Sequence, residues 1–206
     1  MTIKNAINIL IMEGLLLSKR GSGTKVLNHS FWERDTSSVN EYNGLSYQMK
    51  MQKRDLQSQV IVFEVCFPDS RVQEMLKVAA EDPVYHVIRL RILDGDPYIL
   101  ENTFMPIDLV PGLTKEILHR SVYAYLLKEL NYKFAGAYRT FQAAKSDAYD
   151  RQYLKCQADD PVLELEQIIY LESGRPIDYS RRRNRYDVRG YSMLDMKPDL
   201  LNHRKT

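Results

Sequence analysis

Two arginines and one glutamate in residues 82–106 have the clearest chemical potential in this chain. The segment reads DPVYHVIRLRILDGDPYILENTFMP, which predicts a β-hairpin. Alternation along its first arm places Arg89 and Arg91 on one face and aliphatic side chains on the other. Such a pair is either solvated on an outer face or gathered around a phosphate or carboxylate. On the residues alone we expect the solvated arrangement, which is the usual one for charged strand residues.

The length of the turn near Gly95 decides whether Glu101 joins these arginines. If the loop is the even-length 94–97, Arg91 lies opposite Leu100 and Glu101 points to the other face. A loop one residue longer or shorter brings Glu101 beside Arg91. The residues leave both registers open.

A weaker copy of this hairpin, at residues 160–187, indicates that the chain contains a duplicated unit. The shared order of strand, helix and hairpin predicts an α+β fold, a mostly antiparallel sheet with flanking helices. Two copies favour a pseudo-symmetric sheet over a solenoid. The expected strands are at 60–67 and 137–143, and the expected helices at 70–79 and 146–156.

Two further segments could contribute to an anion site. Residues 114–130 predict a helix with a break at Ser121, a residue type that caps helices and would direct free backbone N–H groups of a fresh helix toward an anion. A plain cap with Tyr123 partly buried is an equal interpretation. In the second repeat, residues 181–183 are three consecutive arginines, so at least one face of that strand is wet or paired.

The first 27 residues predict an amphipathic helix stopped by Gly14, and then a hairpin around Gly21 and Gly23 with basic residues at its tip. Winged-helix domains place such a helix in the major groove and such a hairpin on the neighbouring phosphates. Amphipathic helices followed by hairpins are common, so this pattern by itself indicates little.

Composition excludes several classes of protein. With 44% hydrophobic and 27% charged residues and a net charge of +2, the chain is an ordinary globular protein without a uniformly basic surface, so any DNA contact must be local. Neither a signal peptide nor a membrane-spanning stretch is recognisable, and we expect a cytoplasmic protein. Cys66 and Cys156 lack metal or redox spacing and are expected to be reduced core thiols. The four histidines are scattered, so no catalytic residue, metal or cofactor is predicted.

The run TIKNAINILIMEGLLLSKRGSGTKV resembles the second half of the winged helix of GntR-family transcriptional regulators. We expect a partial winged helix at residues 1–27 that lacks the first helices of the family and binds DNA poorly or not at all. The residues predicted to contact DNA or shape the wing are Thr2, Lys4, Asn5, Lys19, Arg20, Gly21, Gly23 and Thr24.

Residues 44–196 resemble the UTRA effector-binding domain of the HutC-type branch of that family, whose fold is similar to chorismate lyase. The resemblance rests on the ordered motifs PVYHVIRLRILDGDPYILENTFMP, SVYAYL, DDPVLELE and GRPIDYSRRRNRYD. Residues 28–43 are polar and without periodicity, which predicts a linker. Residues 197–206 are expected to be a frayed tail.

This resemblance implies a homodimeric repressor of operator DNA, controlled by a small anionic metabolite such as a phosphorylated sugar and without a membrane partner. It favours an odd-length loop or a bulge that brings Glu101 to the arginines. The alternatives are a chorismate lyase-like enzyme and a dimerising remnant without a ligand. The effector contacts implied by matching positions are Arg89, Arg91, Glu101, Ser121, Tyr123, Asp178, Asn184, Asn43 and Gly44.

Overall fold

A computed structural model of the chain describes residues 3–12, 14–27, 36–38 and 44–193. It divides into two compact units, residues 41–189 and residues 1–40 with 190–206. Within the described residues, no helix is long and apolar enough to cross a membrane.

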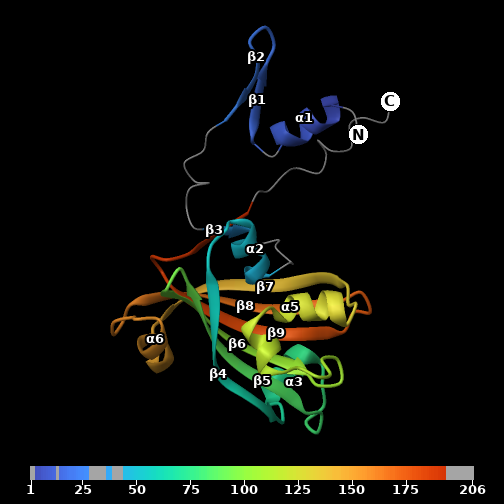
Figure 1. Cartoon of the computed structure of the whole chain (residues 1–206), viewed down its shortest axis with the longest axis vertical. Coiled ribbons are helices and arrows are strands. Elements are labelled where there is room, and N and C mark those ends of the chain that lie inside the picture. Colours follow the sequence, from blue (N-terminus) through green and yellow to red (C-terminus); the bar gives the residue numbers. More distant parts are fainter. Residues whose placement is uncertain (1–2, 13, 28–35, 39–43, 194–206) are drawn as a thin grey trace. The chain divides into compact units, whose positions relative to one another are not determined.

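The larger unit is built on one six-stranded antiparallel sheet with the order β4-β5-β6-β9-β8-β7 (Figure 1). β6 and β9 lie at its centre, so the two hairpins meet there and each repeat contributes one half of the sheet. The strands are β4 (Leu56–Cys66), β5 (Val84–Leu93), β6 (Asp96–Pro106), β7 (Phe134–Lys145), β8 (Pro161–Leu171) and β9 (Pro176–Arg185).

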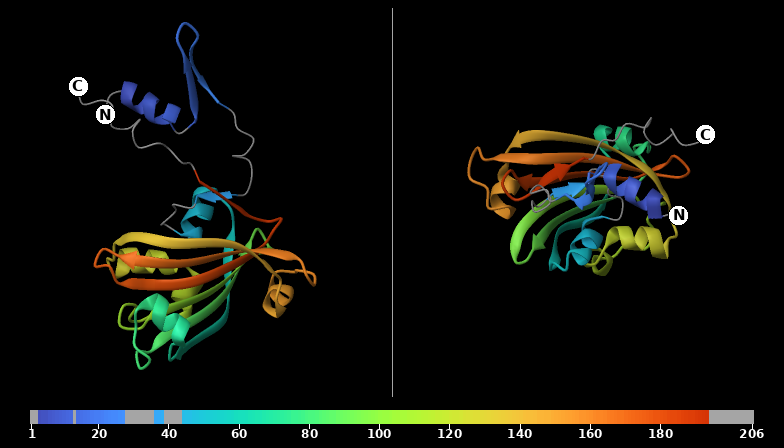
Figure 2. Two further views of the ribbon diagram at one scale, coloured as in Figure 1. Left: turned by 180° about the vertical axis from the view of Figure 1, so that it is seen from behind. Right: turned by 90° about the horizontal axis from the view of Figure 1, so that it is seen from above.

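Helices cover both faces of this sheet (Figure 2). The front face, defined by the side chains of Arg89, Glu101 and Arg182, lies under α4 (Lys115–His119), α5 (Val122–Ala124) and the π-helix η2 (Tyr125–Glu129). The back face, defined by Tyr179 and Arg181, carries α3 (Ser70–Leu76) and α6 (Ala148–Tyr153). One further helix, α2 (Leu45–Met51), packs against the β5–β6 hairpin.

The predicted duplication is confirmed by this topology. The first copy runs β4, α3, β5, β6 and the second runs β7, α6, β8, β9. Each repeat helix packs on the back face, where Val72 and Leu76 of α3 share an apolar cluster with Val84, and Leu154 after α6 shares one with Ile88. Burying one such aliphatic side chain stabilises the fold by about 1.5–3 kcal/mol. The expected α+β class with flanking helices is therefore correct.

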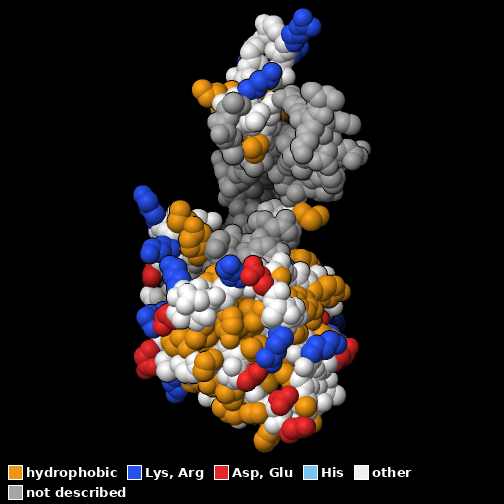
Figure 3. Space-filling view, turned by 90° about the vertical axis from the view of Figure 1, so that its right-hand side faces the viewer, with side chains coloured by type: hydrophobic (Ala, Val, Ile, Leu, Met, Phe, Trp, Pro, Cys, Tyr) orange, Lys and Arg blue, Asp and Glu red, His pale blue; other side chains and the backbone are white. Residues whose placement is uncertain are grey.

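Cys66 is the last residue of β4 and Cys156 follows α6, and neither forms a disulfide. Cys156 is buried and Cys66 is half-buried, each within a cluster of apolar residues. In the space-filling view, hydrophobic side chains gather over a broad area of the larger unit with charged side chains around it (Figure 3). The exposed hydrophobic residues of the sheet include Val65 and Tyr138.

In the smaller unit, α1 (Ile3–Met12) ends as the glycine predicts. Gly14 has a φ of +70°, its N–H donates to Ile11 O, and the Leu15 N–H donates to Leu10 O at 2.9 Å, which together form a Schellman motif. β1 (Leu16–Lys19) and β2 (Gly23–Val26) then form the predicted hairpin.

A second two-stranded sheet in this unit joins β3 (Thr36–Ser38) in parallel to β10 (Gly190–Ser192). β3 lies inside the segment expected to be a linker. Its partner lies about 150 residues further along the chain, a distance at which local composition gives no signal of pairing. The rest of that predicted linker, and the predicted tail, lie outside the described residues.

Candidate functional site

The β5–β6 hairpin closes on the two-residue turn Asp94–Gly95, with φ values of +51° and +92°. Leu93 then pairs with Asp96, and Tyr98 forms a β-bulge that shifts the register by one residue. Beyond the bulge, Arg89 lies directly opposite Glu101. The four-residue loop 94–97 is not formed, and of the two arrangements that the family resemblance favours, an odd-length loop or a bulge, the structure has the bulge.

Glu101 is the centre of a cluster of guanidinium groups on the front face. Its Oε2 accepts hydrogen bonds from Arg89 Nη2 at 2.8 Å and from Arg91 Nη1 at 3.4 Å. Each arginine has a second partner: Arg89 Nη1 donates to Leu118 O at 2.9 Å, and Arg91 Nη2 donates to Ser46 Oγ at 2.8 Å. These contacts join β5 and β6 to the end of α4 and the first turn of α2.

Burial decides between the two interpretations of the arginine pair. Arg89 is 8% exposed, Arg91 is 3% exposed and Glu101 is 2% exposed, so the expectation of a solvated pair is wrong. Burial opposes the charge of Glu101, but the surrounding guanidiniums outweigh it and lower the pKa of the carboxyl to about 2. Burial also lowers the pKa of Arg91 to about 10, which leaves the group charged at neutral pH.

A third arginine, Arg182 of β9, was not predicted as a site residue. It pairs across the sheet with Glu101, and its Nε lies 3.5 Å from Glu101 Oε1. The run of three arginines could have indicated this residue, because side chains alternate along a strand and the middle arginine points to the face opposite its two neighbours. The identity of the strand beside β6 was needed to bring it to Glu101.

Ser121 and Tyr123 lie where the break in the predicted helix places them. The Ser121 Oγ caps α5 by accepting from Ala124 N at 3.2 Å. Tyr123 is buried, and its hydroxyl accepts from Arg182 Nη2 at 3.3 Å and from Gln167 Nε2 at 3.0 Å. Burial raises the pKa of this hydroxyl, so Tyr123 keeps its proton.

These side chains line one small cavity together with the first residues of α2. Gly44 packs against the Tyr123 ring, where an added Cβ would lie 2.9 Å from Cδ2. The cavity has a volume of about 20 Å³, which is room for about one water molecule. Its lining residues are Gly44, Leu45, Ser46, Arg89, Arg91, Glu101, Ser121, Val122, Tyr123 and Arg182.

A second cavity of about 10 Å³ adjoins the first and shares Arg89, Tyr123 and Arg182 with it. Asp178 lines this inner cavity beside apolar residues of β5, β6 and α4. Its Oδ1 accepts from Ser180 Oγ at 2.9 Å, and burial raises the pKa of this carboxyl. The predicted contact Asp178 is therefore in the site, at its inner end.

One predicted effector contact among the described residues is not brought into this lining. Asn184 is buried further along β9 and lines neither cavity, and its amide donates to Arg185 O and Arg189 O. Asn43 lies outside the described residues. Ser46 of α2 was not predicted and lines the site next to Arg91.

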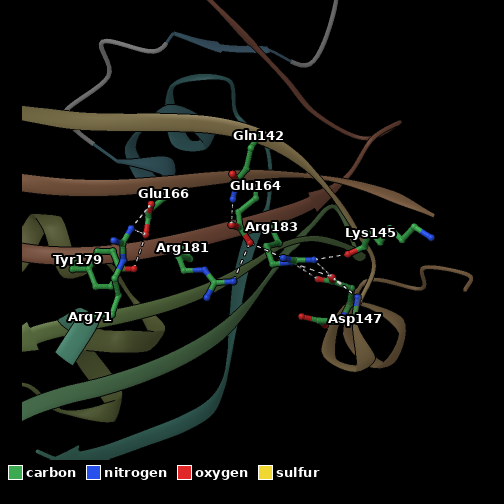
Figure 4. Close-up of polar contacts among 10 residues, drawn as sticks. Arg71, Gln142, Lys145, Asp147, Glu164, Glu166, Tyr179, Arg181 and Arg183 are labelled. Atoms are coloured by element: carbon green, nitrogen blue, oxygen red, sulfur yellow. Dashed lines mark hydrogen bonds and ion pairs between the residues drawn. The ribbon is translucent and has the colours of Figure 1, made fainter. Parts of the chain in front are cut away.

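The back face of the same strands holds a separate polar network (Figure 4). Arg183 points to Glu164 and donates to it at 2.5 Å, and Arg181 donates to the same carboxylate at 3.1 Å. In a second group on the same face, Arg71 and Tyr179 both donate to Glu166. In contrast to the front face, acidic and basic groups are matched here, so this network tethers helices to the sheet and leaves no excess of charge.

The residues predicted to contact DNA lie in the smaller unit. Lys4 and Asn5 of α1 and Lys19 and Arg20 at the tip of the hairpin are exposed. Gly21 and Gly23 take positive φ values of +81° and +80° in the turn, and Thr24 Oγ1 donates to Ser18 Oγ across the hairpin. Thr2 lies outside the described residues.

Comparison with known families agrees with this architecture. Residues 51–188 match the model of the UTRA domain. The chain belongs to the UTRA family. In its first half the UTRA domain carries Arg89, Arg91 and Glu101, and in its second half Asp178 and Arg182.

Similar proteins are named as regulators. The HTH-type transcriptional regulator GmuR of Bacillus subtilis is 43% identical over 188 residues, which cover 91% of this chain and 78% of GmuR. The mannosyl-D-glycerate transport/metabolism system repressor MngR of Escherichia coli is 27% identical over 205 residues, covering 100% of this chain and 81% of MngR. This UTRA protein is thus a transcriptional regulator of the GntR type, and the relatives favour that class over a chorismate lyase-like enzyme.

Solved structures show the same fold. The possible transcriptional regulator YydK of Bacillus subtilis superposes with a TM-score of 0.74 at 24% identity, covering 92% of this chain and 80% of YydK. A GntR-family regulator from Bacillus cereus superposes with a TM-score of 0.61 at 29% identity, covering 66% of this chain and 96% of that one.

Proposed function

We propose that this UTRA protein is a transcriptional repressor whose larger unit binds a small phosphorylated sugar in the Arg89–Arg91–Glu101 cavity. The observation that carries the proposal is a buried excess of positive charge. Arg89, Arg91 and Arg182 surround the ionised carboxylate of Glu101, and the three guanidiniums outnumber the carboxyl groups even when Asp178 of the inner cavity is counted. A buried charge without a counterion is costly, and a phosphate would supply the missing negative charge in a geometry that guanidinium groups favour.

The polar groups around the arginines suit such a ligand. The helical run that begins at Val122 and continues through η2 starts at the cavity, and the positive partial charge of its first turn favours an anion there. Asp178 in the inner cavity is a suitable acceptor for sugar hydroxyls or an amine. MngR is named as the repressor of a mannosyl-D-glycerate transport/metabolism system, and this name supports a sugar derivative as the class of ligand.

Binding must also enlarge the site, because a hexose phosphate does not fit in a cavity of about 20 Å³. α2 forms one wall and is connected to the arginines through the contact of Ser46 with Arg91. A phosphate that takes over the hydrogen bonds of Arg91 releases Ser46. The protein then has two arrangements, one with Ser46 bonded to Arg91 and one with Ser46 released. A ligand controls DNA binding if its affinity for these two arrangements differs, and we propose that the responding form is a homodimer.

Thermal denaturation with a panel of ligands tests the proposal. Glucose, mannose and glucosamine 6-phosphates are compared with the unphosphorylated sugars. We expect at least one phosphate ester to raise Tm by roughly 2–8 °C at saturation, with no effect of its parent sugar.

Variants locate the response. Arg91→Lys keeps the charge but loses the planar fork, and Arg182→Gln removes one guanidinium that is not fully buried, so both are expected to fold and to lose most of the shift. Arg181→Gln is the matched control, because Arg181 neighbours Arg182 on β9 but points to the back face. A panel in which no phosphate ester stabilises the protein, or in which Arg181→Gln loses the response as much as Arg182→Gln, contradicts the proposal.

A further inference from the structure

Gln167 of β8 contacts the site without lining the two front-face cavities. It is 1% exposed, and its Nε2 donates to the Tyr123 hydroxyl at 3.0 Å. It belongs to no sequence motif that predicts a function. Its place opposite Arg139 of β7 and beside Tyr123 nevertheless gives it a defined role in hydrogen bonding.

Arg139 fixes the orientation of the Gln167 amide. The two ends of a glutamine amide have the same shape, and only the partners determine which end is the oxygen. Arg139 Nε lies 2.7 Å from one end and can only donate, so that end is the carbonyl oxygen Oε1. The other end, which faces Tyr123, is therefore the NH₂ group.

The Tyr123 oxygen consequently faces two groups that can only donate. One is the NH₂ of Gln167 at 3.0 Å and the other is Nη2 of Arg182 at 3.3 Å. A phenol oxygen has two lone pairs and one proton, and both lone pairs are occupied here. Among the described residues no acceptor takes the Tyr123 proton, which remains on the oxygen because burial raises the pKa of the hydroxyl.

We propose that Gln167 is a positioning residue that makes Tyr123 an obligate hydrogen-bond donor to the effector. The site then selects a ligand with an acceptor oxygen at this point, as a phosphate or carboxylate has, and disfavours one with an ammonium or amide N–H there. This inference rests on the proposed function, since it concerns the same site. Arg139 orients the amide of Gln167, Gln167 orients the hydroxyl of Tyr123, and of these three residues only Tyr123 contacts the ligand.

A double-mutant cycle on Tyr123 and Gln167 tests this role, with inorganic phosphate as the probe and isothermal titration calorimetry as the measurement. Tyr123→Phe removes the donor, and Gln167→Met removes the amide at similar volume. Each single variant is expected to bind phosphate about fivefold to tenfold more weakly. The double variant is expected to bind no more weakly than Tyr123→Phe, because Gln167 acts only through the hydroxyl.

Gln167→Glu gives a second, sharper comparison. Its carboxylate still accepts from Arg139 but also accepts from Tyr123, which turns the hydroxyl proton away from the ligand. The added negative charge weakens phosphate binding in any case. The loss is therefore measured in the wild-type and Tyr123→Phe backgrounds, and we expect it to be about fivefold larger where the hydroxyl is present.

The possible failures are distinguishable. If the wild-type protein does not bind phosphate, the proposed function is overturned, and this inference with it. If wild type binds and Tyr123→Phe weakens binding, but the Gln167 losses are equal in both backgrounds, Gln167 has a merely structural role. That result overturns the inference and leaves the phosphate site standing.

Discussion

Glu101 shows how one residue determines the character of the site. Its carboxylate holds Arg89 and Arg91 together in a buried position, and they in turn hold its pKa at about 2, against an ordinary value of 4.5. Because the folded-state pKa is the lower one, this contribution to stability is fully present above about pH 4.5 and is lost as the pH falls toward 2. The difference corresponds to stability on the order of 3 kcal/mol.

We therefore expect Glu101→Gln to lower the free energy of unfolding at neutral pH by roughly 3–5 kcal/mol, since it leaves buried guanidiniums without their counterion. Phosphate should restore more stability to this variant than to wild type. Chemical denaturation at neutral pH and at pH 3 measures both effects. Equal losses at the two pH values would show that the carboxylate charge is not the stabilising feature.

A substitution at Gly44, the N-cap residue of α2, tests the contact between this helix and the Tyr123 ring. Gly44→Ala meets the ring at 2.9 Å and also forces alanine to a φ of +79°. Gly174→Ala is the control, because its φ is +82° but nothing lies within 4 Å of the added Cβ. Both variants should lose about 1–2 kcal/mol of stability from backbone strain, and only Gly44→Ala should also lose the thermal response to a phosphate ester. An equal ligand response in both would remove Gly44 from the site.

The family resemblance predicted Arg89, Arg91, Tyr123 and Asp178 as effector contacts, and the structure places all four along the two front-face cavities, while residue patterns alone favoured a solvated arginine pair. Arg182 and Ser46 could not be found in this way. Arg182 reaches the site only because β9 pairs with β6, and Ser46 only because α2 packs on the β5–β6 hairpin. Both are long-range consequences of folding, for which one strand or helix gives no local signal.

At the scale of elements, the two short helices on the front face differ in their relation to the cavity. α4 is capped by Thr114, which accepts from Ile117 N at 3.4 Å, and α5 is capped by Ser121, which accepts from Ala124 N at 3.2 Å. Only Ser121 lines the cavity. Cap removal typically costs about 1 kcal/mol, so Ser121→Ala and Thr114→Ala should lower stability similarly.

Ligand affinity should separate these two variants. We expect Ser121→Ala to weaken binding of a phosphate ester by about fivefold, because both the hydroxyl and the order of the first turn contribute to the anion site. Thr114→Ala should leave affinity unchanged within twofold. Calorimetric titration of both variants is the measurement, and equal affinities would assign Ser121 to the cap alone.

Most elements could be predicted from local sequence patterns. For the exceptions, a physical reason explains why the local pattern was not enough. The repeat, the helix ending at Gly14 and the hairpin after it were predictable, because apolar periodicity and turn glycines are local signals. The bulge at Tyr98 was not fixed by the residues, since either register alternates equally well along one strand. The pairing of β3 with β10 joins segments with no shared local signal.

At the scale of the whole molecule, a net charge of +2 leaves DNA contact to a few residues. The partial winged helix is expected to bind duplex DNA only weakly, so binding is measured at low ionic strength, where phosphate contacts are strongest. We expect Lys19→Gln with Arg20→Gln to lower the salt dependence of this weak binding by about two counterions, together with its affinity. Lys133→Gln with Lys128→Gln is a control in the larger unit, with the same change of charge. Fluorescence anisotropy against salt concentration measures this, and an equal effect of both pairs would argue against the hairpin as the contact.

The central claim is that a phosphate binds among Arg89, Arg91 and Arg182, and phosphorus NMR of inorganic phosphate tests it without knowledge of the sugar. We expect a saturable shift of the phosphate resonance on adding the protein. We also expect the bound phosphate to lose its second proton at a pH at least one unit lower than the free ion, because the guanidiniums favour the dianion. The Arg182→Gln variant should reduce both effects and Arg181→Gln neither. A resonance that does not shift, or a bound phosphate that titrates like the free ion, would contradict the account.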